Sequence, residues 1–275
     1  MNITGKRGLV LGASRGIGLA IARTLAHQGV RLALPWFDWP ESAAAMATEF
    51  GSPVGRHLTL RVDLRDPDEV ARLVGEIQEK LGGLEILINN IERGGMPVLH
   101  GGYHREVNRG QWQLEMETTL HAKWLVFEQS LPLLQQGPEA VVINISSIAA
   151  MVGRSGPSGL LFNDGYAAAN RGVSSLTETW AKKGAPSIRV NEIMLGLIDG
   201  RHGPGTRGWQ LLTGEQRQAL IDHTLLRRTG TPEEVARAVL FLVRDADFLT
   251  GTVLRMDGGY VLGGERPLDM PEGML

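Results

Sequence analysis

The chain has 275 residues, of which 43% are hydrophobic and 21% are charged, a balance typical of a globular protein rather than a disordered one. Its net charge of −2 gives no electrostatic basis for binding nucleic acid or an anionic membrane, and the absence of cysteine excludes disulfides and thiolate metal sites. No uncharged apolar run approaches the ~18 residues of a membrane span. We therefore expect a cytoplasmic protein that binds neither nucleic acid nor a membrane.

Short apolar runs alternate with helical patterns along the chain, which is typical of successive βαβ units. The expected strands are residues 8–11, 30–34, 57–62, 84–89, 140–145, 187–193 and 252–256. Because crossovers of this kind place helices on both faces, the strands should be buried on both sides. The pattern predicts one doubly wound, Rossmann-type α/β domain over residues 1–275, with a seven-stranded parallel sheet between two layers of helices.

The helix expected between the third and fourth strands has the clearest start. Asp66 is the expected N-cap, Pro67 takes the first helical position, and Glu69 is placed to complete a capping box. Apolar residues then recur at helical spacing, at Val70, Leu73, Val74, Ile77 and Leu81. Thr231 opens a late helix in the same way.

Two further stretches are expected to lie outside the regular βα units. Segment 200–230 is too long for a simple connection, so we interpret it as a lid. Its apolar side chains, which include Trp209 and Leu220, suit an apolar substrate and equally a contact between subunits. Residues 263–275 are rich in glycine and proline and should form an irregular C-terminal tail.

The first expected strand runs directly into a glycine-rich turn, Gly12-Ala13-Ser14-Arg15-Gly16-Ile17-Gly18, and then into a helical pattern. Free amides and the positive end of the helix dipole would meet a pyrophosphate at this place. A plain strand-to-helix turn is the alternative, but the strand before, the helix after and the following βα units favour a dinucleotide site.

The spacing Gly12-x-x-x-Gly16-x-Gly18 resembles the fingerprint of the short-chain dehydrogenase/reductase family. Other stretches similar to that family follow in order: Asp63-Leu64, Asn89-Asn90, Asn144 to Ser147, Tyr166, Arg189 to Asn191, residues 228–236 and residues 250–260. The resemblance covers essentially the whole chain. It implies an NAD(P)-dependent oxidoreductase that interconverts a small-molecule carbonyl and an alcohol by hydride transfer, assembled as a homodimer or homotetramer.

In that family a serine holds the substrate oxygen and a tyrosine transfers its proton. A lysine four residues after the tyrosine binds the nicotinamide ribose and lowers the tyrosine pKa, and an asparagine completes a proton relay. Ser147 and Tyr166 match the first two, whereas Asn170 replaces the lysine and Thr119 takes the place of the asparagine. A cation about 5 Å from the phenol favours phenolate by roughly 3 kcal/mol at an effective dielectric of ~20, and Asn170 cannot supply it.

The resemblance also implies which residues bind the cofactor: Gly12, Ser14, Arg15, Gly16, Ile17, Gly18, Trp36, Asp63, Leu64, Asn90, Tyr166, Asn170, Gly196 and Ile198. Trp36 stands where NAD-preferring relatives place an acid, and Arg15 resembles the basic residue that NADP-preferring relatives set against the 2′-phosphate. Together, Trp36 and Arg15 favour NADP(H) slightly over NAD(H) as the cofactor. The aromatic segment from Trp36 to Trp39 could stack on adenine, block its site or pack on neighbouring helices.

Other departures surround the expected cofactor site, among them Glu92 shortly after the fourth strand and Leu195 before Gly196. Three hypotheses remain open: an oxidoreductase using Tyr166 and Ser147, a catalytically impaired nucleotide-binding or scaffolding relative, and an enzyme with lyase or isomerase chemistry. No metal site is expected, because two glycines lie between His100 and His104 and neither histidine has an aspartate or cysteine partner in register.

Overall fold

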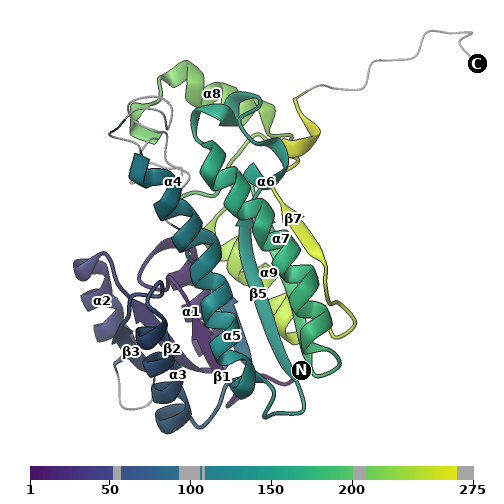
Figure 1. Cartoon of the computed structure of the whole chain (residues 1–275). Coiled ribbons are helices and arrows are strands. Elements are labelled where there is room, and N and C mark those ends of the chain that lie inside the picture. The colour runs from purple at the N-terminus through teal and green to yellow at the C-terminus, as the bar shows by residue number, and fades with distance from the viewer. Residues whose placement is uncertain (52–56, 93–105, 107–108, 201–208, 265–275) are drawn as a thin grey trace, which may run out of the picture.

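A computed structural model describes residues 1–51, 57–92, 106, 109–200 and 209–264 (Figure 1). Seven strands form one sheet in the order β3-β2-β1-β4-β5-β6-β7, and every neighbouring pair is parallel. The strands are β1 (Arg7–Val10), β2 (Arg31–Trp36), β3 (Leu58–Arg61), β4 (Ile86–Asn89), β5 (Ala140–Ser147), β6 (Ile188–Leu195) and β7 (Val253–Met256). The predicted fold class is confirmed, and β5 and β6 each continue two residues beyond the expected end.

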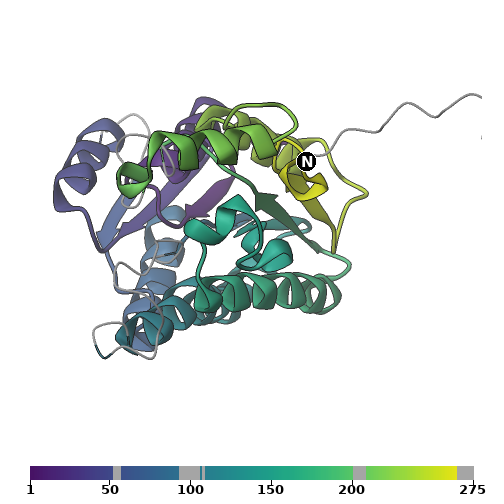
Figure 2. The same ribbon diagram turned by 90° about the horizontal axis from the view of Figure 1, so that it is seen from above.

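Helices cover both faces of this sheet (Figure 2). The α-helices are α1 (Gly16–His27), α2 (Pro40–Phe50), α3 (Pro67–Leu81), α4 (Arg109–Glu115), α5 (Ala122–Leu134), α6 (Ala149–Val152), α7 (Asp164–Gly184), α8 (Gly214–His223) and α9 (Pro232–Arg244). Short turns of other helix types are η2 (Met116–His121), η3 (Pro157–Leu160), η4 (Trp209–Leu211) and η5 (Tyr260–Leu262). None of the helices within the described ranges is long and apolar enough to cross a membrane.

Two apolar cores lie on opposite faces of the sheet. One joins α1 and α9 to the strands, and the other joins α3, α5 and α7 to them. A third cluster lies beyond the carboxyl ends of the strands, where Tyr166 of α7 and Leu220 of α8 share one buried group with Ile148. Since burial of apolar surface is the main stabilising contribution, this third cluster fixes the start of α7 against the strand ends.

Local capping signals explain where the helices begin. The Asp66 side chain accepts hydrogen bonds from the amides of Asp68 and Glu69, as expected for the N-cap of α3. The predicted capping box of α3 is wrong, because the Glu69 carboxylate instead accepts from the amide of Asp63. Asp63 lies in the loop after β3, and this loop passes close enough to α3 for the Asp63 amide to donate to Glu69. Thr231 forms the full capping box expected at α9.

The strand order places a topological switch between β1 and β4, so the carboxyl ends of β1, β4, β5 and β6 share one edge. Part of the predicted lid, 201–208, and most of the predicted tail, 265–275, lie outside the described residues. The described remainder of segment 200–230 contains η4 and α8, and α8 contributes Leu220 to the cluster at this same edge. The fold therefore gathers the predicted site residues at one end of the sheet.

Candidate active site

The turn between β1 and α1 requires glycine at three places. Gly12 and Gly16 have φ angles of +66° and +52°, which side chains disfavour. A Cβ at Gly12 would overlap the carbonyl oxygen of Asn90, and a Cβ at Gly18 would overlap that of Gly12. Around Gly16, by contrast, no described atom lies within 4 Å of the Cβ position.

This turn is suited to the diphosphate of a dinucleotide. Helix α1 begins at Gly16, so the amides of its first turn have no partner within the helix and carry its positive dipole end. The Asn90 side chain donates to the carbonyl of Leu11 at 3.4 Å and thus holds the turn from β4. The open space at Gly16, together with those amides, fits the nicotinamide nucleotide predicted to bind here.

Aromatic side chains and arginines meet at the end of β2, where the adenosine would lie. The Arg15 guanidinium lies 4.0 Å from the centroid of the Trp39 ring, and Trp39 is 49% exposed. Arg61 and Arg65 lie over the ring of Phe37, at 4.8 and 5.4 Å. The aromatic segment was expected to stack on adenine, to block its site or to pack on neighbouring helices. The last of these does not describe Trp39, because its ring is half exposed and stacked on an arginine.

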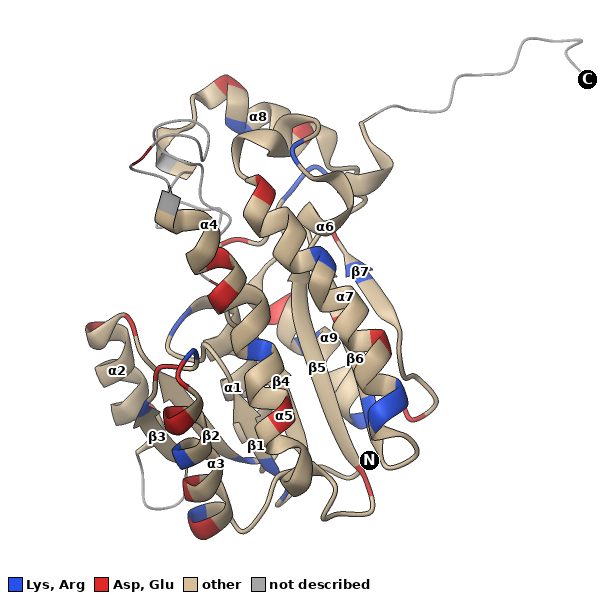
Figure 3. Cartoon of the chain, viewed as in Figure 1, with Lys and Arg blue, Asp and Glu red and all other residues tan. Residues whose placement is uncertain are grey.

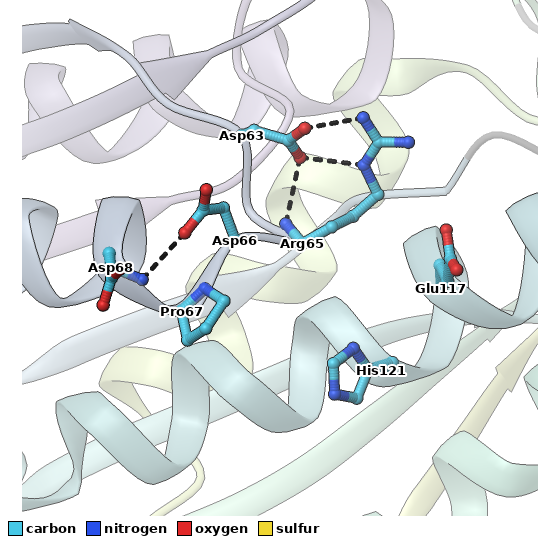
Figure 4. Close-up of a pocket in the computed structure, with 7 residues that line it drawn as sticks. All are labelled: Asp63, Arg65, Asp66, Pro67, Asp68, Glu117 and His121. Carbon is cyan, nitrogen blue, oxygen red and sulfur yellow. Dashed lines mark hydrogen bonds and ion pairs between the residues drawn. The ribbon is translucent and has the colours of Figure 1, made fainter.

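Asp63, predicted to bind the cofactor, forms an ion pair with its neighbour Arg65. The Arg65 side chain donates to both Asp63 carboxylate oxygens, at 2.8 and 2.6 Å, and this ion pair lowers the pKa of Asp63. Figure 4 shows this pair at the rim of a hollow of about 580 Å³, facing Glu117 and His121 across it. Because carboxylates line much of this hollow, it does not suit a phosphate. Leu64 packs at the edge of the apolar core beneath.

Ser147 and Tyr166, the predicted catalytic pair, are brought together. Ser147 is the last residue of β5, and Tyr166 is the third residue of α7, whose N-cap Asn163 accepts from the Tyr166 amide at 2.8 Å. The two side chains are hydrogen-bonded to each other. Both residues are buried, with 5% and 2% of their surfaces exposed.

Burial raises the pKa of the Tyr166 hydroxyl well above its usual value. Hydrogen bonds with Ser147 and Asn170 lower the pKa, but they do not offset the loss of water, and the carboxylate of Glu115 raises it further. A neutral phenol is therefore the stable form of Tyr166 at neutral pH.

The two positions that depart from the family pattern also lie at this site. Asn170 donates to the Tyr166 carbonyl at 3.0 Å, and neither its Oδ1 nor the Thr119 Oγ1 has a hydrogen-bond partner among the described residues. Thr119 lies in η2, a π-helical turn of a kind that is rare and often found at functional sites. Leu120 packs directly on Gly172 of α7, so η2 and α7 approach closely. The buried Asn170 oxygen could accept from a nicotinamide ribose hydroxyl.

Glu115, at the end of α4, is a site residue that the sequence analysis missed. It is fully buried, and its Oε1 accepts from Gln111 Nε2 at 2.7 Å and from Asn163 Nδ2 at 2.5 Å. It thereby connects α4 to the N-cap of the helix that carries Tyr166. In the sequence, the only indication of Glu115 would have been an acidic residue on the buried side of a predicted helix. Only the fold shows that Tyr166 is its neighbour.

The remaining predicted residues line the same edge. Gly196 follows β6 and packs on Asp257, where a Cβ would lie 2.7 Å from the Asp257 Cα, and Ile198 is buried and bridges to Gly230. One carboxylate oxygen of Glu92, just beyond β4, is also buried. His100 and His104 lie outside the described residues. Within the described ranges, no group of three or more metal-ligating side chains could hold a metal ion.

Residues 12–261 match the family model described as enoyl-(acyl carrier protein) reductase. The chain is 30% identical over 264 residues to a 3-oxoacyl-(acyl-carrier-protein) reductase of Vibrio cholerae, covering 95% of this chain and all of that relative. It is 32% identical over 254 residues to the cis-4-hydroxycyclohexanecarboxylate dehydrogenase of Sinomonas cyclohexanicum, covering 92% of this chain and 95% of that protein.

Solved structures agree with these relatives. A dehydrogenase/reductase from Sinorhizobium meliloti superposes with a TM-score of 0.79 at 26% identity, covering 94% of this chain and 96% of that one. A blue fluorescent protein from a metagenomic library, solved in complex with NADPH, gives 0.79 at 28% identity, covering 94% and 99%. The chain belongs to the short-chain dehydrogenase/reductase family of NAD(P)-dependent oxidoreductases, which interconvert carbonyls and alcohols.

Proposed function

We propose that this member of the family works mainly as an NADPH-dependent carbonyl reductase, with Tyr166 as the proton donor and Ser147 as the group that orients the substrate oxygen. The observation that carries this proposal is the hydrogen bond between the buried side chains of Tyr166 and Ser147, and burial and Glu115 raise the pKa of the phenol, which stays protonated at neutral pH. A group held in its protonated form is ready to donate.

The protonation state of this phenol affects the rate of each direction at a given pH. When bound, the nicotinamide nucleotide supplies or accepts the hydride. In reduction, Ser147 donates a hydrogen bond to the carbonyl oxygen while Tyr166 gives that oxygen a proton. Oxidation of an alcohol needs the reverse step, for which Tyr166 must first be a phenolate. Burial, Glu115 and the absence of a cation at Asn170 all disfavour that form.

Binding of the cofactor is proposed to follow the family pattern. The amides of the glycine turn would hold the diphosphate, and Asn170 would contact the nicotinamide ribose. Arg15, at the start of α1, favours NADP(H) because a guanidinium can pair with the 2′-phosphate. Trp36 offers no carboxylate to the ribose diol of NAD(H), which supports the same preference. The NADPH in the metagenomic neighbour supports it as well.

Assembly and closure over the substrate are also proposals. Exposed apolar side chains near the outer strand β7, at Phe248, Leu249, Val253 and Leu254, support a homodimer or homotetramer. Leu220 of α8 shares a cluster with Tyr166, which supports a role for segment 200–230 in covering the substrate.

A second candidate is a nucleotide-binding protein with impaired catalysis. The observation in its favour is that Asn170 Oδ1 and Thr119 Oγ1 have no hydrogen-bond partners in the described part of the chain, at the two positions where the family has its lysine and asparagine. Such a protein would bind the nucleotide without turning it over.

Fluorescence titration with NADPH and NADH, followed by turnover on a panel of ketones and alcohols, separates the two. The reductase proposal predicts saturable NADPH binding, measurable ketone reduction, slower alcohol oxidation at neutral pH and loss of both reactions in Tyr166→Phe. Binding without turnover would favour the second candidate, and no binding would contradict both.

A further inference from the structure

A lysine and a glutamate are buried beneath the catalytic pair. Lys123 lies on α5, one helical turn after Thr119, and only 1% of its surface is exposed. Glu192 lies in the middle of β6 and is fully buried. In Figure 3 the acidic segments of the helix that runs from α4 into α5 are followed by a basic one. Charged side chains are almost never buried this completely unless they are paired.

Glu192 connects the strand that carries Ser147 with the helix that carries Tyr166. It accepts a hydrogen bond from Ser146, the residue before Ser147, through the Ser146 hydroxyl. It also accepts from the Ser174 hydroxyl at 3.0 Å and from the Thr177 hydroxyl at 3.3 Å, both on α7. Ser174 lies two helical turns beyond Tyr166 on that helix. Glu192 therefore fixes the end of β5 relative to α7.

Lys123, on α5, contacts the same end of β5. Its Nζ donates to the carbonyl of Ile145 at 2.6 Å, two residues before Ser147. Burial lowers the pKa of Lys123 to about 7 and raises that of Glu192, while the attraction between the two charges opposes both shifts. Among the described residues Glu192 is the charged group that shifts the pKa of Lys123, and the other polar contacts of the two residues are hydroxyls and the Ile145 carbonyl.

We propose that the buried charges of Lys123 and Glu192 together position Ser147 against Tyr166, in a site that lacks the lysine expected at position 170. The pair holds β5 through the Ile145 carbonyl and the Ser146 hydroxyl, and it joins β5 to α7 through Ser174. Both are positioning residues, since they act through Ser147 and Tyr166. The inference rests on the roles proposed above for these two residues.

The test compares two double variants that remove the same charges. Lys123→Met with Glu192→Gln removes the buried pair without leaving an unpaired charge, which a single change would do. Lys183→Met with Glu128→Gln is the matched control, because it removes the same two charges from an exposed ion pair that joins α7 to α5. The buried double variant should lower kcat about tenfold or more, as expected for a misplaced catalytic group. Its NADPH Kd should stay within about twofold, since the changes lie away from the glycine turn.

The pH profile distinguishes positioning by a charged pair from a general loss of packing. In the wild type, kcat should fall as Lys123 loses its proton near pH 7, and this step should be absent from the buried double variant. The control should keep the kcat and the profile of the wild type. A buried double variant with wild-type kcat and pH profile, or an equal loss in the control, would overturn the proposal.

A measurement that does not depend on turnover completes the test. The chain has three tyrosines, so 3-fluorotyrosine labelling gives three ¹⁹F resonances, and Tyr166→Phe assigns one of them. That resonance should shift in the buried double variant and stay in place in the control. If the double variant does not fold, Glu192→Gln alone, which keeps the shape and an acceptor oxygen, is read in the same way. An unmoved Tyr166 resonance contradicts the positioning role even if the wild type turns over no substrate tested.

Discussion

Restoring the lysine at position 170 tests the electrostatics of the site. In Asn170→Lys, an ammonium would stand one helical turn beyond Tyr166, about 5 Å from the phenol. At an effective dielectric of ~20 it would favour the phenolate by roughly 3 kcal/mol. That corresponds to about two pKa units and about a hundredfold more phenolate at a given pH. The Thr119 Oγ1, buried without a partner in the described part of the chain, offers this ammonium an acceptor.

Because only alcohol oxidation needs the phenolate, Asn170→Lys should raise the rate of oxidation more than the rate of reduction. We expect kcat for alcohol oxidation at pH 7–8 to rise roughly ten- to a hundredfold, and kcat for ketone reduction to change less. The assay is initial-rate kinetics in both directions over a pH series. Asn170→Met is the control, since it has a long stem without the charge. Equal rates in Asn170→Lys and Asn170→Met would refute the view that the missing charge limits Tyr166.

Three further outcomes are expected. Arg15→Ala should weaken NADPH binding more than NADH binding in a fluorescence titration, and equal losses would reject the proposed contact with the 2′-phosphate. Gly18→Ala should abolish binding of both nucleotides, because its Cβ would overlap the Gly12 carbonyl oxygen, and tight NADPH binding by this variant would contradict the proposed turn geometry. The pKa of Lys123, lowered to about 7 by burial, predicts that between pH 7 and 9 the unfolded chain keeps a proton that the folded chain releases. From pH 7 to pH 9, the unfolding free energy of the wild type, measured in urea, should therefore rise by about 2 kcal/mol relative to that of the double variant Lys123→Met with Glu192→Gln. A difference between the two proteins that stays constant over this pH range would contradict the lowered pKa of Lys123.

Local sequence patterns predicted most of the fold because the responsible interactions are local. The seven strands follow from short apolar runs, and the starts of α3 and α9 follow from Asp66 and Thr231 as caps. The error at Glu69 has the opposite cause. Its carboxylate found the amide of Asp63 in the preceding loop, a partner that spacing within a helix cannot indicate.

The site was predictable only in part. The family spacing indicated Ser147 and Tyr166, and the structure places their side chains in contact. The roles of Glu115 and of the Lys123–Glu192 pair depend on which elements pack together. In the sequence these are acids and a lysine within helices and a strand, with nothing to show that they share one buried region. The π-helical turn around Thr119 has no marker in the sequence either.

Transfer of deuterium from 4-deuterated NADPH to a ketone, followed by mass spectrometry of the alcohol, is the most direct test of the central claim. We predict a label on the carbinol carbon with the wild-type chain and almost none with Tyr166→Phe. A chain that binds NADPH tightly yet transfers no label to any ketone, or one whose transfer survives the loss of the Tyr166 hydroxyl, would contradict it.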